Sequence, residues 1–148
     1  MFKVNDYVVK ANHGVCQIID IVHLDMPSID KKREYFFLVP IDDRSMKVYV
    51  PVDMSEQNLR YAMDDKQALQ CIESMKSIDS AWIKNDKQRE AFYRDALKSC
   101  DPTQLIAIIK NMFERKQDRL ASGKSAIVVD DKYFKLAEEQ LFSELAFA

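Results

Sequence analysis

Residues 46–52 read Met46-Lys47-Val48-Tyr49-Val50-Pro51-Val52, and the hydrophobic pattern of the chain changes within them. Before Pro51, short runs rich in Val, Ile, Tyr and Phe are separated by clusters of Asp, Ser, Pro and Asn, which is typical of antiparallel strands. After Pro51, apolar residues recur at spacings of three and four, which indicates helices. The sequence therefore predicts a β-rich first part and a helical remainder.

The first part is predicted to be a small β module. We expect strands over residues 7–10, 15–24, 34–40 and 46–52. Four or five short strands in roughly 55 residues are too few for a sandwich, but they suit a small, strongly twisted barrel or a half-open sheet. The expected fold class is therefore α+β, with an SH3-like or Tudor-like small β-barrel over residues 1–60 and a helical domain over residues 61–148.

The second part is predicted to be a compact bundle of about four helices. Asp64 and Asp65 can cap the first, a second is expected over residues 86–98, and Asp101-Pro102 is the clearest start of the third. Gly123 ends that helix, and Asp130 or Asp131 begins the last. The apolar faces expected to be buried are Ala68, Leu69, Ile72 and Met75, then Ala91, Phe92 and Leu97, then Leu105, Ile106, Ile109, Met112 and Phe113, then Phe134, Ala137, Leu141 and Leu145.

The residue counts argue against an enzyme. Only two glycines are present, Gly14 and Gly123, so neither a Walker loop nor a GxGxxG motif exists. His13 and His23 lack neighbours that would pair a nucleophile with a base, and the three widely spaced cysteines lack zinc spacing, so we interpret them as reduced structural thiols. We expect no catalysis, no metal, no cofactor and no small-molecule substrate.

The sequence gives no sign of a membrane or an export signal. No apolar run approaches the roughly 18 residues that span a bilayer, and residues 1–6 contain no apolar signal region. We therefore expect a cytoplasmic protein without a membrane partner.

Positive charge is concentrated in the helical part. The chain has a formal net charge of -2, but residues 82–135 contain twelve Lys and Arg against eight Asp and Glu. The single tryptophan, Trp82, stands close before Lys84 and Lys87, so an indole lies beside cations that suit phosphate. Such an indole can wedge at a base step of DNA, or it can simply fill the core of the helical domain.

Three groups of residues together form a recognisable pattern. The groups are Phe2-Lys3-Val4-Asn5-Asp6-Tyr7-Val8-Val9 with Asn12-His13-Gly14-Val15; Val48-Tyr49-Val50-Pro51-Val52-Asp53 with Asn58-Leu59-Arg60; and Trp82 with the basic helix after it, Leu97-Lys98-Ser99-Cys100-Asp101, Arg115 and Arg119. Together they resemble the CarD/CdnL family of bacterial RNA polymerase-binding transcription regulators, whose N-terminal module is shared with the transcription-repair coupling factor. Asn5 and Cys100 stand where relatives favour Gly.

The resemblance implies a Tudor-like domain that adds an exposed sheet edge to a strand of the polymerase β subunit. We expect strand 46–52 to be this edge, with Tyr49, Val50 and Pro51 as contact residues. Relatives often carry a base at the position of Tyr49, so an ion-pair form of the contact is not expected here.

The resemblance also implies promoter DNA as a partner of the helical domain. The tryptophan of the family motif enters the minor groove at the upstream edge of the melted region, which assigns that role to Trp82, with Lys84, Lys87 and Lys132 as phosphate contacts. The predicted function is a transcription regulator that stabilises the open promoter complex. The alternative is a polymerase-bound adaptor whose helical domain recruits another protein, with Trp82 in that interface.

Overall fold

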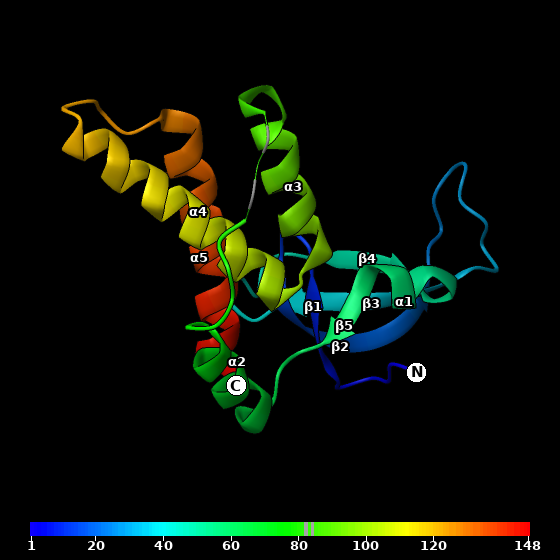
Figure 1. Cartoon of the computed structure of the whole chain (residues 1–148). Coiled ribbons are helices and arrows are strands. Elements are labelled where there is room, and N and C mark those ends of the chain that lie inside the picture. The colour runs from blue at the N-terminus through cyan, green and yellow to red at the C-terminus, as the bar shows by residue number, and fades with distance from the viewer. Residues whose placement is uncertain (82, 84) are drawn as a thin grey trace. The chain divides into compact units, whose positions relative to one another are not determined.

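A computed structural model describes residues 1–81, 83 and 85–148 and divides the chain into two compact units, Met1–Ala62 and Met63–Ala148. A sheet forms most of the first unit and helices form the second (Figure 1). Both kinds of structure are present, so the predicted α+β class is confirmed.

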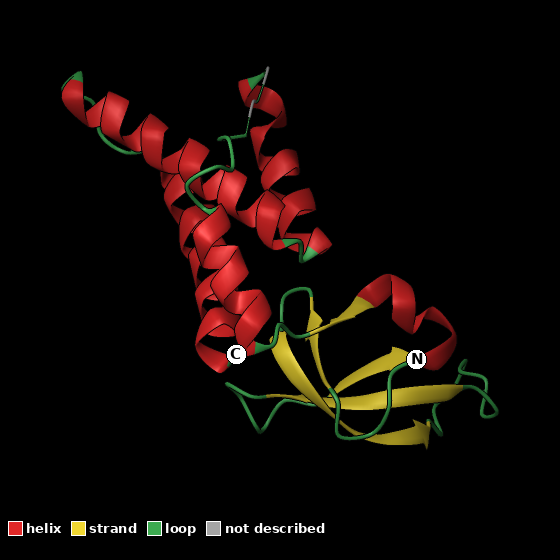
Figure 2. Cartoon of the chain, turned by 60° about the horizontal axis from the view of Figure 1, so that its bottom comes forward, coloured by secondary structure: helices red, strands yellow, loops and turns green. Residues whose placement is uncertain are grey.

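The strands of the first unit form one antiparallel sheet with the order β4-β3-β2-β1-β5 (Figure 2). They are β1 (Tyr7–Lys10), β2 (Gly14–His23), β3 (Glu34–Pro40), β4 (Val48–Pro51) and β5 (Leu59–Tyr61). Between β4 and β5 the chain forms a 3-10 helix, η1 (Val52–Met54), and a single helical turn, α1 (Ser55–Asn58).

The sheet is open among the described residues, so the predicted small barrel is not closed, and the half-open sheet that the strand count also suits agrees with the structure. β4 pairs only with β3, and β5 only with β1, which makes these two short strands the edges of the sheet. A closed barrel needs every strand paired on both sides. The residues between β4 and β5 are helical, and an irregularity in β2 between Ile18 and Asp20 bends the sheet without joining its edges.

Alternating side chains of the sheet form the core of the first unit. Val8, Ile18, Phe36 and Leu38 are fully buried on one face. Phe2 packs edge-on against Phe36, with ring centroids 6.5 Å apart and planes at 87°. The segment before β1 is thereby fixed to the sheet.

Two residues that stand where relatives favour glycine adopt the left-handed backbone conformation. Asn5 has φ of 77° and its N–H donates to the Ile18 carbonyl at 2.7 Å, while Cys100 has φ of 55° and ends a helix. Asn visits this region readily, whereas Cys100 accepts strain of roughly 1 kcal/mol. The turns that favour glycine are therefore kept although the glycines are absent.

The second unit contains α2 (Asp65–Ser74), a 3-10 helix η2 (Asp86–Gln88), α3 (Arg89–Ser99), α4 (Pro102–Ala121) and α5 (Val128–Phe147). Asp64 caps α2, because its carboxylate accepts from the N–H of Gln67 while the Gln67 side chain accepts from the N–H of Asp64. Asp101 caps α4 through the N–H of Thr103, and Pro102 takes the first helical position. Both starts agree with the sequence prediction.

The last helix begins earlier than expected. α5 starts at Val128, with Ile127 as its N-cap, so Asp130 and Asp131 lie in its first turn and neither caps it. Asp130 is only 7% exposed and binds residues of α3 and α4. Acidic residues in a first helical turn still suit the helix dipole, which explains why the sequence pattern misplaced the start by two or three residues.

The core of the helical unit is built mainly by α3, α4 and α5. Its buried members are Tyr93, Ala96, Leu97, Leu105, Ile106, Ile108, Met112, Tyr133, Ala137 and Leu141. Several residues expected in the core are exposed instead: Leu69, Ile72, Ala91, Phe92 and Phe113. α2 and the residue after it pack against this core through Cys71 and Met75. Met75 belongs to the apolar face expected from the sequence, whereas Cys71 does not.

None of the three cysteines, all of which the structure describes, forms a disulfide bond. No helix among the described residues has both the length and the apolar character needed to cross a membrane. Within residues 1–81, 83 and 85–148, no group of three or more His, Cys, Asp or Glu side chains is placed to hold a metal ion.

Candidate functional site

The open edge strand β4 contains all three residues that the sequence assigned to polymerase contact. Tyr49 is 42% exposed, and Pro51 is half-buried. Val50 points to the opposite face and is only 2% exposed, because it belongs to the sheet core. Side chains on this strand can therefore reach a partner from Tyr49 and Pro51, whereas Val50 stabilises the strand from inside.

The register of β4 shows which backbone groups face the open edge. Antiparallel pairs alternate between those that exchange two hydrogen bonds and those that exchange none. Pro51 lies opposite Tyr35 and has no N–H, so these two residues cannot exchange two hydrogen bonds and form a non-hydrogen-bonded pair. Because the two kinds of pair alternate, Tyr49 and Phe37, two residues away, also form a non-hydrogen-bonded pair. The N–H and C=O of Tyr49 consequently point away from β3, toward the unpaired side.

An aromatic pair covers the surface beside this edge. The rings of Phe37 and Tyr49 stack with centroids 5.4 Å apart and planes at 27°. Non-hydrogen-bonded pairs bring opposite side chains closest together, which agrees with this contact. Phe37 was not predicted as a site residue, and only its place opposite Tyr49 in the sheet reveals it.

An ion pair lies near the end of β4. The Arg33 guanidinium donates to the Asp53 carboxylate at 2.9 Å and lies 5.8 Å from the Tyr35 ring. The hydrogen bond with Asp53 raises the pKa of Arg33 further above its usual range. The two charges neutralise one another within the sheet unit.

In the helical unit, residues 77–81 are held along α4. The N–H of Ala81 donates to the Ala107 carbonyl at 2.9 Å, and the Asn111 side-chain amide donates to the Ala81 carbonyl at 2.9 Å. The Lys110 ammonium donates to the Ile78 carbonyl. Trp82 and Lys84 lie outside the described residues, but the segment that leads to them is fixed at both backbone groups of Ala81.

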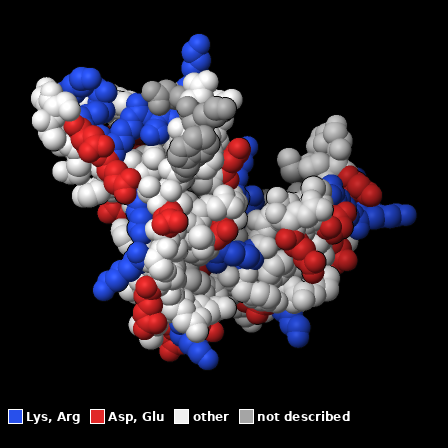
Figure 3. All heavy atoms as spheres, viewed as in Figure 1, with Lys and Arg blue, Asp and Glu red and all other residues white. Residues whose placement is uncertain are grey.

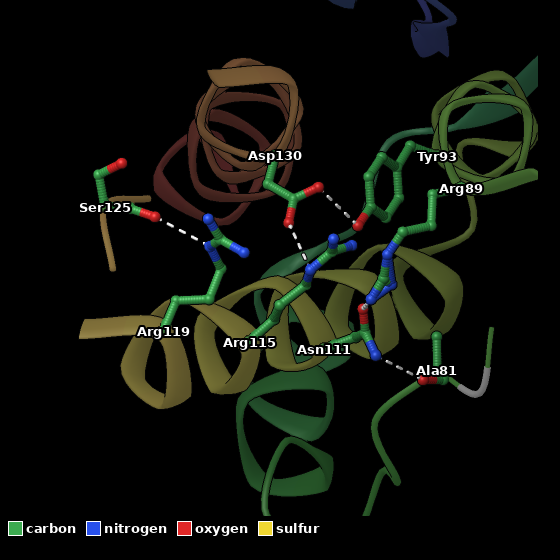
Figure 4. A network of polar contacts seen from close by, with 8 residues as sticks. All are labelled: Ala81, Arg89, Tyr93, Asn111, Arg115, Arg119, Ser125 and Asp130. Carbon is green, nitrogen blue, oxygen red and sulfur yellow. Dashed lines mark hydrogen bonds and ion pairs between the residues drawn. The ribbon is translucent and has the colours of Figure 1, made fainter. Parts of the chain in front are cut away.

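Asn111 joins that segment to α3 as well. Its side-chain oxygen accepts from both terminal nitrogens of Arg89, at 3.2 and 3.0 Å (Figure 4). One amide group therefore binds the segment before Trp82 and the first turn of α3 together. The sequence analysis missed Asn111, and nothing in a lone amide on a helix marks it.

A buried polar network lies beside this contact. The Tyr93 hydroxyl donates to Asp130 at 3.1 Å, and the Arg115 Nε lies 3.5 Å from the other Asp130 oxygen. Burial, followed by the Asp130 charge, raises the pKa of Tyr93 to about 12. This phenol is neutral at physiological pH, and the network serves to connect α3, α4 and α5.

A polar hollow lies along the last turns of α4 and the loop that follows. It is lined by Asn111, Glu114, Arg115, Asp118, Arg119, Ser122 and Lys124. Arg119 is held there by a 2.8 Å bond from its Nε to the Ser125 carbonyl. Figure 3 shows Lys and Arg side chains gathered over this end of α4, with acidic side chains beside them.

The two described lysines of the predicted DNA site lie on different elements of the helical unit. Lys87 is exposed in η2, and Lys132 is exposed in the second turn of α5, with its ammonium 5.5 Å from the centre of the Tyr133 ring. Arg115 and Arg119 were noted as part of a basic helix but not assigned to the site. Their spacing of four places them on one face with Asn111, which the sequence could have indicated.

The first unit is thus a small open antiparallel sheet whose unpaired edge suits the binding of another strand. Its sequence identifies the module: residues 2–63 match the model of the CarD-like/TRCF RID domain, an RNA polymerase-interacting domain. The resemblance stated from the opening residues is confirmed for this unit, and the protein is a transcription-related one that interacts with RNA polymerase. A comparison with curated proteins gave no match.

Proposed function

We propose that this protein is a non-enzymatic transcription regulator that binds the β subunit of bacterial RNA polymerase through β4 and stabilises the open promoter complex through Trp82. The observation that carries the proposal is the RID domain with an unpaired edge strand. The proposal needs no cofactor and no small-molecule substrate. It assigns the protein to the cytoplasm, where bacterial polymerase works.

The polymerase contact is proposed to be strand addition. An edge strand offers a row of donors and acceptors, and a partner strand that pairs with them gains affinity from the main chain. The Tyr49 N–H and C=O supply one such pair of groups. The exposed Tyr49 ring and half-buried Pro51 lie on the same face and add selectivity.

The DNA contact is proposed to involve the tryptophan together with bases of the helical unit. The hydrogen bonds that fix the backbone of Ala81 support this DNA contact. An inserted side chain can keep two DNA strands apart only if the backbone beside it is held in place. Lys87, Lys132 and the polar hollow at the end of α4 offer cations to phosphate on the same unit.

The mechanism requires no chemistry. A protein that binds the melted promoter more tightly than the closed one shifts the equilibrium toward the melted state. A differential affinity of about 1.4 kcal/mol shifts it about tenfold. Because the chain is net acidic, its own DNA affinity is expected to be weak, and binding to polymerase supplies the high local concentration that the wedge needs.

A protein adaptor is the second candidate, favoured by exposed apolar side chains on the helices. Phe92, Phe113 and Leu120 are 41%, 54% and 50% exposed. Large apolar residues of this kind are common in protein interfaces. In that case Trp82 and these residues would bind a further protein, and DNA would not be touched.

The first prediction separates the two candidates. Trp82→Ala is expected to shorten the lifetime of open promoter complexes several-fold while leaving polymerase affinity unchanged, because the wedge and the anchor lie in different units. The lifetime is measured by competitor challenge of preformed complexes. Phe113→Ala is the control, since it truncates an exposed aromatic residue that the wedge mechanism does not use.

Circular dichroism must show that both variants are folded. An unchanged lifetime with Trp82→Ala, in a folded protein that still binds polymerase, would overturn the wedge. That outcome would favour the adaptor, whereas a shortened lifetime with Phe113→Ala as well would overturn a role that is specific to Trp82.

A further inference from the structure

The surface beside the β4 edge is aromatic and carries little unbalanced charge. Tyr49 lies on the outer face of the sheet, stacked on Phe37 and 42% exposed. The nearest strong charges at the far end of β4, Arg33 and Asp53, bind each other at 2.9 Å. Lys47, just before the strand, is the exposed base at its other end.

The backbone geometry makes Tyr49 the centre of any strand added here. Its N–H and C=O both face the open edge, whereas Pro51 offers only a carbonyl. A strand that pairs with this edge must therefore place one of its residues directly opposite Tyr49. Side chains of residues directly opposite one another lie on the same face, about 5 Å apart at Cβ.

We infer that the polymerase strand places an apolar side chain opposite Tyr49, where it packs on the Phe37–Tyr49 pair, and that this contact rather than an ion pair selects the partner. The inference rests on the proposed function and specifies its partner. An acidic side chain opposite Tyr49 would lose its bound water on contact with the two aromatic rings. It would also gain no ion pair with Arg33, because Arg33 already binds Asp53. An apolar side chain would bury both aromatic surfaces.

The tyrosine hydroxyl is not needed for this contact. The ring of Tyr49, not its hydroxyl, makes the stacking contact with Phe37. Tyr49→Phe should therefore keep affinity, whereas Tyr49→Ala removes half of the apolar surface and Tyr49→Arg inserts a charge opposite an apolar group.

The test measures the dissociation constant of the full chain for bacterial core RNA polymerase at low and high NaCl. We expect Tyr49→Phe to bind within about twofold of the unchanged protein, and Tyr49→Ala and Tyr49→Arg each to weaken binding about tenfold or more. The weakening by Tyr49→Ala should be similar at both salt concentrations, because apolar contacts are not screened. Tighter binding by Tyr49→Arg, or no loss with Tyr49→Ala, overturns the inference.

Tyr49→Pro distinguishes this inference from the proposed function. It removes the outward N–H without breaking a bond to β3, so it should abolish strand addition and leave the sheet folded. If Tyr49→Pro loses binding while Tyr49→Ala keeps it, the edge is right and only the aromatic contact is wrong. If both variants keep binding polymerase, β4 is not the strand that binds it, and the proposed function is wrong as well.

Thermal unfolding checks that each variant is folded. If Tyr49→Pro is unfolded, replacement of the Tyr49 amide by an ester removes the same donor and retains the side chain. Loss of binding by that ester supports the edge, and full binding overturns it.

Discussion

Asp130 shows how one buried carboxylate determines the packing of three helices. It is 7% exposed and receives the Tyr93 hydroxyl from α3 while facing Arg115 from α4. A buried charge is tolerated only when its oxygens are bound, so both partners are needed. From the sequence, Asp130 resembles an ordinary helix-capping acid, because nothing local distinguishes a buried carboxylate from an exposed one.

Tyr93→Phe tests this network. Loss of the hydroxyl donor is expected to lower the free energy of unfolding at pH 7 by about 1–2 kcal/mol. The pKa of Tyr93 is raised from 10.0 to about 12, so its contribution is fully present below about pH 10 and is lost as the pH rises toward 12. Between pH 10 and pH 12 the unchanged protein should therefore lose more stability than the variant, as measured by urea unfolding followed at 222 nm.

Tyr133→Phe is the matched control. The Tyr133 hydroxyl donates to Glu90 at 3.0 Å, but Glu90 is exposed and can bind water instead. Its removal should change stability by less than about 0.5 kcal/mol. Equal losses of stability in the two variants would show that the buried hydrogen bond to Asp130 contributes no more than the one to Glu90.

At the level of helices and strands, the sequence predicts the features that depend on neighbouring residues. It does not predict the features that depend on contacts with residues far away in the chain. The starts of α2 and α4 follow from Asp64 and from Asp101-Pro102, because a cap acts within one turn. The start of α5 was misplaced by two or three residues because acids suit a first helical turn, where Asp130 and Asp131 lie, as well as the start of a helix. Distant contacts decide the buried face of α2: the spacing of Leu69 and Ile72 predicts a helix correctly, but they are exposed because α2 packs through Cys71 and Met75.

Asp101→Ala should destabilise the helical unit by about 1 kcal/mol. The carboxylate accepts from the Thr103 N–H at 2.9 Å, and α4 supplies four buried core residues, so fraying its first turn loosens the core. Urea unfolding at 222 nm measures the change. Asp64→Ala is the comparison: it removes an equivalent cap from α2, which has one buried residue, Ala68, and should affect global unfolding less. A larger effect of Asp64→Ala would mean that α2 is central to the unit.

For the whole molecule, the sequence indicates the order of a β part and a helical part but not how the sheet ends. The change of pattern after Pro51 is visible in the sequence, whereas β5, the strand Leu59–Tyr61, lies beyond it and has only three residues. Strand pairing joins residues far apart in the chain, so neither the open sheet nor the outward direction of the Tyr49 backbone follows from local patterns. The resemblance implied that strand 46–52 is the edge, but the outward direction of the Tyr49 N–H and C=O became identifiable only once Tyr35 was found opposite Pro51.

The position of the boundary determines how the two units can be separated. Tyr61 pairs with Val8, and the Ala62 N–H donates to the Tyr7 carbonyl at 3.0 Å, so a cut after residue 60 would damage the sheet. The Met63 N–H donates to Glu144 at 2.9 Å, within the helical unit. A cut between residues 62 and 63 severs neither set of bonds within a unit.

The fragment of residues 1–62 is expected to bind polymerase within about threefold of the full chain, because strand addition uses only the sheet. The fragment of residues 63–148 should not bind polymerase, and its DNA binding should be weak and fall steeply with salt. Mixing the two fragments should fail to lengthen open-complex lifetime, since the covalent connection supplies the local concentration that the helical unit needs. This prediction is tested by measuring the lifetime of open promoter complexes with the full chain, with each fragment and with the mixture. If the mixture at micromolar concentration matches the full chain, the link between the units has no role and the helical unit must bind the promoter complex tightly by itself.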